Sequence, residues 1–355
     1  MSKAFDFSQS IKGDGAFDGF TLPTGSGNGV AGEMRFNTTT GQMEYWSSTS
    51  STPQWRDVDE VPIVDFTVTY LVVGGGASGS TYGTNSATGV TSVTHVGGTD
   101  GGDSVFSTIT SIGGGAGGEG GYSGTGGAGG SGGGGATGGA GTSGQGNDGG
   151  DIPSGTGSYV GAGGGGAGAA GGDNTSSASG AGGIGATTTI ITTSQATTHS
   201  VGEVSGSNVY FAGGGGGGRY NSTNVGVGGI GGGGDGGGQY INPTAPLANS
   251  GGGAGGRDSS GTRSNGGGAG GMRQGTLTVS TNSALTVTVG EGGTKPTIYG
   301  GGTMYDGADG VVILKYPNTY TATFSSGVTF TSDTDGSNNI RIIKAAGTGD
   351  TVTFT

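Results

Sequence analysis

Alternating apolar and polar residues predict short β-strands near both ends of the chain. The segment "GEMRFNTTTGQMEYW" spans residues 32–46 near the N-terminus. Met34 and Phe36 alternate with polar residues on its first arm. Met43 and Tyr45 do the same on the second arm, after the turn sequence "NTTTG". This pattern is typical of a β-hairpin.

Two strongly apolar segments, "YLVV" (70–73) and "VVILKY" (311–316), lie on either side of a long glycine-rich region. Continuous apolar runs of this length are typical of buried strands. We therefore expect these segments to pair, or nearly to pair, in a small base sheet from which glycine tracts run out and back. Two more segments have strand composition, "SVFSTIT" (104–110) and "GTLTVSTNSALTVTVG" (275–290), and the second resembles a pair of strands.

The tail, residues 320–355, also alternates, and "DTDGSNN" (333–339) supplies a turn. It predicts a small all-β module. Changes in composition divide the chain into a β module at 1–60, a glycine-rich domain at 61–318 and a C-terminal β module at 319–355. The predicted fold class is mostly β and irregular, with essentially no α-helix.

Glycine dominates the middle of the chain, with 97 glycines among 355 residues and only 29% hydrophobic residues. Such tracts cannot build a conventional core, and glycine loses more conformational freedom on folding than any other residue. A flexible linker is one interpretation. The other is a bundle of polyglycine-II helices, with three residues per turn, in which backbone groups bond to neighbouring helices. The length and the aromatic residues at tract boundaries favour a bundle framed by β-strands.

The chain is acidic, with a formal net charge of -12 and no basic residue between Arg56 and Arg219. This balance argues against nucleic acid as a partner, and we attribute the acidity to solubility and mutual repulsion. The absence of cysteine excludes disulfides and thiolate metal sites. The start "MSKAFDFSQSIKG" has no apolar run of signal-peptide length, and no segment has the hydropathy of a membrane span. We expect neither an N-terminal export signal nor membrane insertion.

No catalytic arrangement of residues is evident. His95 and His199 lie in connectors rich in Thr, Val and Ser, which favours surface residues over general bases. The clusters "GDGAFDG" (13–19) and "DTDGSNN" do not have EF-hand spacing, and we interpret them as turns rather than calcium sites. The sequence therefore predicts a protein that is not an enzyme, with no cofactor and no metal.

Three features resemble bacteriophage virion fibres and adhesins. The hairpin at 32–46 with Trp55 is similar to a small module of phage tail fibres. The frame "YLVVGGG" to "GADGVVILKY" resembles the glycine-rich domain of phage fibre proteins, and the tail is similar to β modules of fibre-like proteins of marine phages. In the T-even-type tip adhesins, such tracts form a sandwich of polyglycine-II helices with receptor-binding distal loops.

The resemblance implies a structural, non-enzymatic fibre or tail adhesin of the virion, assembled in the host cytoplasm and mediating attachment to the host surface. It also implies a homo-oligomer, a trimer by analogy. The N-terminal region would dock to other virion proteins through Met34, Phe36, Met43, Tyr45, Trp46 and Trp55. Two alternatives are a capsid or neck decoration fibre without a dedicated receptor, and an ice- or surface-binding polyglycine bundle.

Tyrosine and arginine residues punctuate the glycine tracts, and both residue types are enriched in binding hot spots. Aromatic rings can stack on sugars of a host surface polysaccharide or fill pockets of an outer-membrane protein. The other interpretation is that the tyrosines cap and wedge the ends of the bundle. The candidate receptor contacts are Tyr82, Tyr122, Tyr159, Arg219, Tyr220, Tyr240, Arg257, Arg263 and Tyr305, and Arg273 lies in a similar connector.

Overall fold

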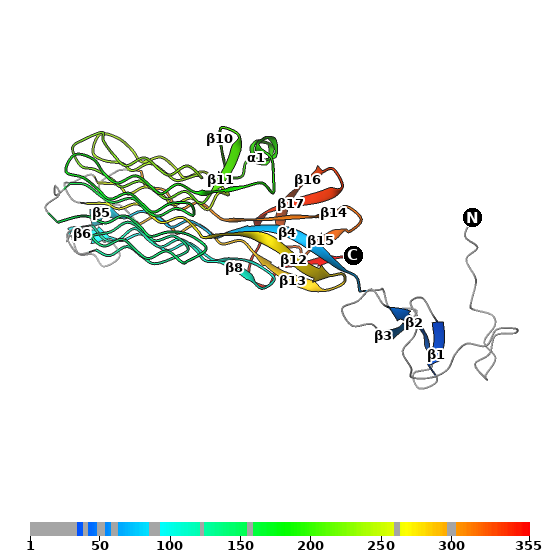
Figure 1. Ribbon diagram of the computed structural model, residues 1–355. Helices are drawn as coiled ribbons and strands as arrows, with labels where there is room; N and C mark the ends of the chain where they lie inside the picture. Colours follow the sequence, from blue (N-terminus) through cyan, green and yellow to red (C-terminus); the bar gives the residue numbers. More distant parts are fainter. Residues whose placement is uncertain are drawn as a thin grey trace, which may run out of the picture. The chain divides into compact units, whose positions relative to one another are not determined.

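A computed structural model gives the architecture of the chain (Figure 1). It describes residues 34–37, 42–47, 54–57, 63–84, 93–120, 124–154, 159–258, 263–296 and 303–355. Within these ranges, short β-strands frame long glycine-rich tracts, and a single short helix is present. The predicted class, mostly β and irregular with essentially no α-helix, is confirmed. The chain forms two compact units: residues 1–67 with 278–283 and 353–355, and residues 68–277 with 284–352.

The first unit contains a three-stranded antiparallel sheet. Its strands are β1 (Met34–Asn37), β2 (Gln42–Ser47) and β3 (Gln54–Asp57), in that order. The predicted hairpin is confirmed, with Met34 opposite Tyr45. Trp46 lies opposite Trp55 on β3, and their ring centroids are 5.5 Å apart in an edge-on arrangement.

Two five-stranded sheets contain most of the remaining strands. The first has the order β12 (Met272–Ser280), β4 (Asp65–Val73), β14 (Val311–Pro317), β17 (Asn338–Ala345), β16 (Thr329–Asp335). The second has the order β15 (Ala322–Phe324), β18 (Thr351–Phe354), β13 (Ala284–Thr288), β7 (Ser104–Phe106), β8 (Ile109–Ser111).

The predicted pairing of the two most apolar segments is confirmed. β4 and β14 are antiparallel neighbours, with Val73 opposite Val311 and Tyr70 opposite Leu314. β17 covers the other edge of β14. A central strand has neighbours on both sides, and Leu314 is accordingly fully buried.

Two expectations differ from the structure. Residues 275–290 do contain two strands, but β12 and β13 belong to different sheets. The tail at 319–355 is not a module of its own, because β17 pairs with β14 and β18 joins the sheet of β13. Its apolar residues Ile340, Ile342 and Ile343 are fully buried, and a separate small module offers no such core. The predicted turn at 333–339 is confirmed: Gly336 adopts φ 59° between β16 and β17.

An insertion at one side of the glycine-rich region was not anticipated from the sequence. It contains β9 (Ala186–Thr188), α1 (Thr193–His199), β10 (Glu203–Ser205) and β11 (Asn208–Phe211). Thr192 caps α1 in a capping box with Gln195. The insertion packs its buried Phe211 into the cluster that holds Leu71 and Ile313.

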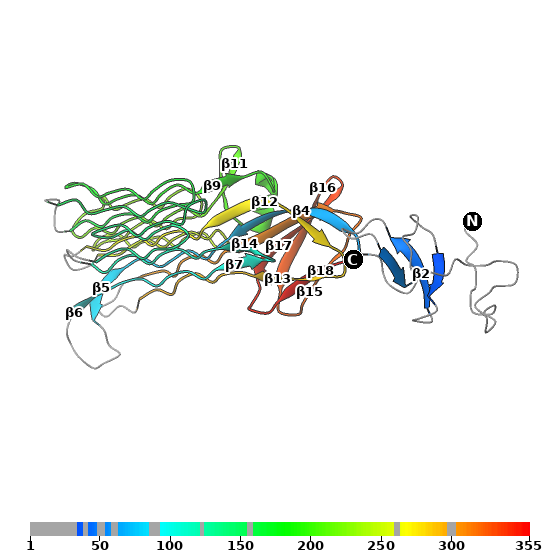
Figure 2. The same cartoon turned by 60° about the horizontal axis from the view of Figure 1, so that its bottom comes forward.

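The glycine tracts form an ordered bundle of side-by-side runs (Figure 2). In tract 213–219, residues three apart donate to the same neighbouring tract. The amide groups of Gly213 and Gly216 donate to Gly231 and Gly234, those of Gly214 and Gly217 to Gly183 and Gly180, and those of Gly215 and Gly218 to Gly267 and Ser264. The carbonyl groups of the tract accept bonds from Gly253 and Gly256, Gly229 and Gly226, and Gly164 and Gly161.

This pattern is that of a polyglycine-II helix. Three residues per turn, each with one donor and one acceptor, direct hydrogen bonds to six surrounding tracts. Tracts 74–80 and 264–271 are surrounded in the same way. Glycine is required because a Cβ atom on Gly215 would lie 2.0 Å from the carbonyl oxygen of Ala254. Backbone hydrogen bonds and close backbone contact therefore replace a side-chain core.

Outer tracts lack a neighbour on one side, and aspartates there accept the free amide hydrogens. Gly138 and Gly141 donate to Asp151 and Asp148 at 2.6 and 2.7 Å. The same device recurs along the surface of the bundle, with Asp100, Asp103, Asp173, Asp235, Asp306 and Asp309 as acceptors. The acidity of the chain, attributed above to solubility, thus also completes the bundle's hydrogen bonding.

Candidate functional site

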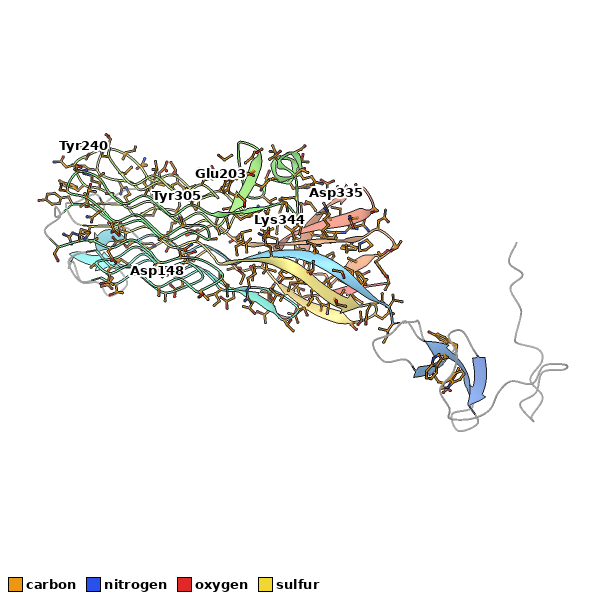
Figure 3. All side chains as sticks on the ribbon, in the orientation of Figure 1. Asp148, Glu203, Tyr240, Tyr305, Asp335 and Lys344 are labelled. Atoms are coloured by element: carbon orange, nitrogen blue, oxygen red, sulfur yellow. The ribbon has the colours of Figure 1, made fainter. Side chains whose placement is uncertain are left out.

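Three tyrosines gather at the end of the bundle farthest from β14 and β17, where Figure 3 labels Tyr240. The ring centroids of Tyr159 and Tyr220 are 5.7 Å apart. The hydroxyl of Tyr240 donates to Oδ1 of Asn221 at 2.9 Å. We call Tyr159, Arg219, Tyr220, Asn221 and Tyr240 the tip cluster.

The bundle itself positions the tip cluster. Central tract 213–219 ends at Arg219, whose amide still donates to the carbonyl of Gly237 at 3.0 Å. The next amide, that of Tyr220, donates to the carbonyl of Tyr159 at 3.2 Å. Asn221 then adopts φ 57°, a left-handed conformation that Asn tolerates, and the chain leaves the bundle. The cluster therefore rests on hydrogen-bonded backbone rather than on a free loop.

Tyr240 begins a segment that runs back along the outside of the bundle. The amide of Thr244 donates to the carbonyl of Asp235, and the amide of Leu247 donates to that of Gly232. Both donors and acceptors are three residues apart, so the segment keeps the polyglycine-II period. Pro243 and Pro246 fit this conformation because proline fixes φ near that of polyproline II and needs no partner for its nitrogen.

The tip cluster is accessible and mostly neutral. Tyr240 is 65% exposed and Tyr159 is 50% exposed. The guanidinium of Arg219 donates to the backbone carbonyl of Ser177, which fixes its position. Exposed phenol rings beside amide and hydroxyl groups offer contact area together with directional hydrogen bonds, as in antibody paratopes. The arrangement is suited to recognition.

Arg257 and Arg263 do not belong to this surface, contrary to the sequence-based prediction. Arg257 is 6% exposed and Arg263 is 5% exposed. Burial lowers the pKa of the Arg257 guanidinium below its ordinary value, and the neighbouring Asp258 carboxylate opposes that shift. Arg257 directly follows one packed glycine tract and Arg263 directly precedes another, and both side chains are buried at these tract ends. The sequence shows that an arginine lies between two glycine tracts, but it does not show whether the arginine side chain is exposed or buried.

The remaining candidates are separated from the tip cluster or lie outside the described side chains. Tyr305 is half-buried on the flank of the bundle (Figure 3). Tyr122 lies outside the described residues, and only the backbone of Tyr82, in β5 (Thr81–Thr84), is described. β5 pairs with β6 (Val93–Val96), whose His95 side chain is likewise outside the description.

The predicted docking residues lie in the first unit. Tyr45, Trp46 and Trp55 are half-buried in its sheet. Met34 and Phe36 lie on β1, and Met43 lies on β2, but their side chains are outside the description. The segment at 13–19 is outside it as well.

His199 makes a structural contact. Its Nε2 lies 2.9 Å from Oδ2 of Asp333, and its side chain is 12% exposed. The backbone N–H of Thr334 and the His199 side chain lower the pKa of Asp333 below its ordinary value. In the part of the chain that the structure describes, no three His, Asp or Glu side chains are grouped to hold a metal ion.

Comparison with models of known protein families, with curated proteins and with solved structures found no match to this chain. Among the described residues, α1 with its seven residues is the only helix, and it is far too short to cross a membrane.

Proposed function

We propose that the protein is a structural fibre or adhesin of a bacteriophage virion and attaches the particle to the host surface through the tip cluster. The observation that supports this function is the group of tyrosines, with Tyr159 and Tyr240 exposed and Tyr220 half-buried, at the end of a bundle held by backbone hydrogen bonds. A rigid scaffold that presents aromatic side chains reduces the ordering cost of binding. The layout also resembles that of phage tip adhesins.

The partner would be a host surface polysaccharide or an outer-membrane protein. The tip cluster is accessible to either, and Tyr240 with Asn221 already forms a polar and aromatic pair. The first unit, with its β1–β3 sheet, would dock the chain to other virion proteins. A homo-oligomer, a trimer by analogy, remains part of this proposal.

Regular rows of threonine on a flat face would favour the ice-binding alternative. Two outer tracts instead present aliphatic residues three apart: Ala181 and Ile184 on one, Val227 and Ile230 on the other. Val227 is 62% exposed and Ile184 is 46% exposed. These rows carry no threonine, which counts against the ice-binding alternative, and a thermal-hysteresis assay tests it directly.

Two measurements test the proposal. Immunogold electron microscopy with antibody against residues 61–355 should label the tail or its fibres. Label on the capsid or neck would instead identify a decoration fibre, and no label on intact particles would overturn the virion assignment.

The second measurement is binding of the purified chain to host cells. Y220A/Y240A should weaken it at least about tenfold, since hot-spot aromatics each contribute more than about 1 kcal/mol. The matched control, Tyr305→Ala on the flank, should bind as the parent does. If Y220A/Y240A bound host cells as tightly as the parent chain does, the tip cluster would be excluded as the contact surface.

A further inference from the structure

A cavity of about 660 Å³ lies where β12 begins. Its lining comes from β4, β8, β9, β12 and the segments 144–147 and 167–168. A second cavity of about 370 Å³ adjoins it and shares Tyr70 and Gln274. Both are open to solvent, and their volumes are in the range of small-molecule sites, about 300–1,000 Å³.

Two side-chain amides beside the larger cavity are held in place by one hydrogen bond each, and each has one polar atom left to bond to a ligand. Gln145 is 8% exposed, and its Oε1 accepts the amide of Ile112 at 2.9 Å. Asn147 donates from Nδ2 to the carbonyl of Gly166 at 2.9 Å. Among the described residues, the Gln145 Nε2 and the Asn147 Oδ1 have no hydrogen-bond partner. The cavity is thus provided with an amide donor and an amide acceptor.

Arg273 is the one cationic residue that lines this cavity. It is exposed, and within the described ranges its guanidinium takes part in no ion pair or hydrogen bond. The Arg273 side chain is therefore available to an anionic ligand. A guanidinium binds a carboxylate through two parallel hydrogen bonds.

Apolar groups complete the walls. Tyr70 lies with its ring centroid 6.3 Å from that of Phe106, and Ile109 and Met272 add aliphatic surface. Gln274 lines both cavities and is held in place, because its Oε1 accepts from the Thr188 hydroxyl and its Nε2 donates to the carbonyl of Thr187. A pyranose ring has the same mixture of apolar faces and polar edges that these walls present.

We propose that this cavity binds a carboxylated sugar of the uronic acid class. The Arg273 guanidinium would pair with the carboxylate, and Gln145 and Asn147 would bond to hydroxyl groups. The remote negative charges of the chain oppose this only weakly, since salt screens exposed charges beyond about 8 Å at physiological ionic strength. The inference does not depend on the proposed function of the tip cluster.

The test is a titration of the full chain by NMR or calorimetry with methyl glucuronide, methyl glucoside and acetate. We expect the glucuronide to bind in the millimolar range and the other two compounds to bind at least about tenfold more weakly, because a charged hydrogen-bonded pair is lost with glucoside and the ring contacts are lost with acetate. Arg273→Ala should weaken glucuronide binding by a similar factor, and Arg273→Glu should abolish it.

Lys295→Ala is the matched control, because it removes one exposed positive charge from a residue that does not line the cavity. It should leave glucuronide binding unchanged. Thermal unfolding of each variant checks that it is folded. Absence of glucuronide binding to the parent chain, equal binding of acetate or glucoside, or full binding by Arg273→Ala would each overturn the proposal.

Discussion

The carboxylate of Asp148 accepts the amide hydrogen of Gly141 at 2.7 Å, across the outer surface of the glycine-rich bundle. Asp151, three residues further on, accepts that of Gly138 in the same way. A helix with three residues per turn returns to the same face every third residue. Two aspartates three residues apart can therefore accept hydrogen bonds from two glycine amides three residues apart on the neighbouring tract. The pairing shows how a bundle without a side-chain core ends at its surface.

Removal of these acceptors should destabilise the bundle measurably. For D148A/D151A we expect a loss of about 2 kcal/mol, which is less than the roughly 3–6 kcal/mol of two charged hydrogen bonds because the freed amides at this exposed surface can bond to water. Thermal unfolding would measure it. Glu291→Ala is the control, because it removes an exposed acid whose side chain makes no hydrogen bond within the described ranges. A loss of the same size in the control would indicate a general charge effect.

A methyl group inside the bundle should be tolerated far less well than one at its edge. In Gly215→Ala the new Cβ would lie 2.0 Å from the Ala254 carbonyl oxygen, and six surrounding tracts would resist its displacement. Overpacking of this kind costs about 1–3 kcal/mol or more. In the control, Gly97→Ala, the nearest atom is the flexible Glu119 Cγ at 3.3 Å. Equal unfolding temperatures for the two variants would contradict the packing described above.

The turn between β17 and β18 should depend on pH through Asp350. The Ser325 hydroxyl, at 2.6 Å from Oδ1, and the Gly347 amide lower the pKa of Asp350 below its ordinary value of 3.8. A lowered folded-state pKa means that the stabilisation is present above pH 3.8 and is lost as the pH falls through the lower value.

The stability difference between the parent chain and Asp350→Asn should therefore be constant from about pH 7 to 5 and should shrink below about pH 4. Unfolding in denaturant at a series of pH values would measure it. Ser325→Ala removes the largest cause of the shift and should reduce the pH-dependent part. If the difference in unfolding free energy between the two chains grew as the pH fell, the lowered pKa of Asp350 would be contradicted.

The helix of the insertion should depend on its capping box. Thr192→Ala removes the side chain that accepts the Gln195 amide at 3.2 Å, and we expect a cost of about 1 kcal/mol. The loss should appear as faster hydrogen exchange in α1. Thr198→Ala, at an exposed position within the helix, should leave exchange unchanged or slow it, since alanine has the higher helix propensity.

Local patterns predicted the local elements correctly. The hairpin around Met34 and Tyr45, the strand at 70–73 and the turn at Gly336 follow from alternation, apolar runs and turn residues, which act between near neighbours in the chain. The sequence also favoured glycine tracts that are ordered rather than disordered, because a backbone without side chains must find its hydrogen bonds in neighbouring backbones. For the tip cluster, the sequence supplied Tyr159, Tyr220 and Tyr240 but not their proximity.

By itself, then, the sequence determined the hairpin, the apolar strands and the need for backbone packing, since these depend on residue type and spacing. The tertiary structure decided which tracts are neighbours, because glycine tracts are chemically alike and only the fold distinguishes them. It enclosed Arg257 while it left Tyr240 exposed, and it joined β17 to β14. Each of these outcomes depends on contacts between residues far apart in the chain, which packing selects and local pattern does not encode.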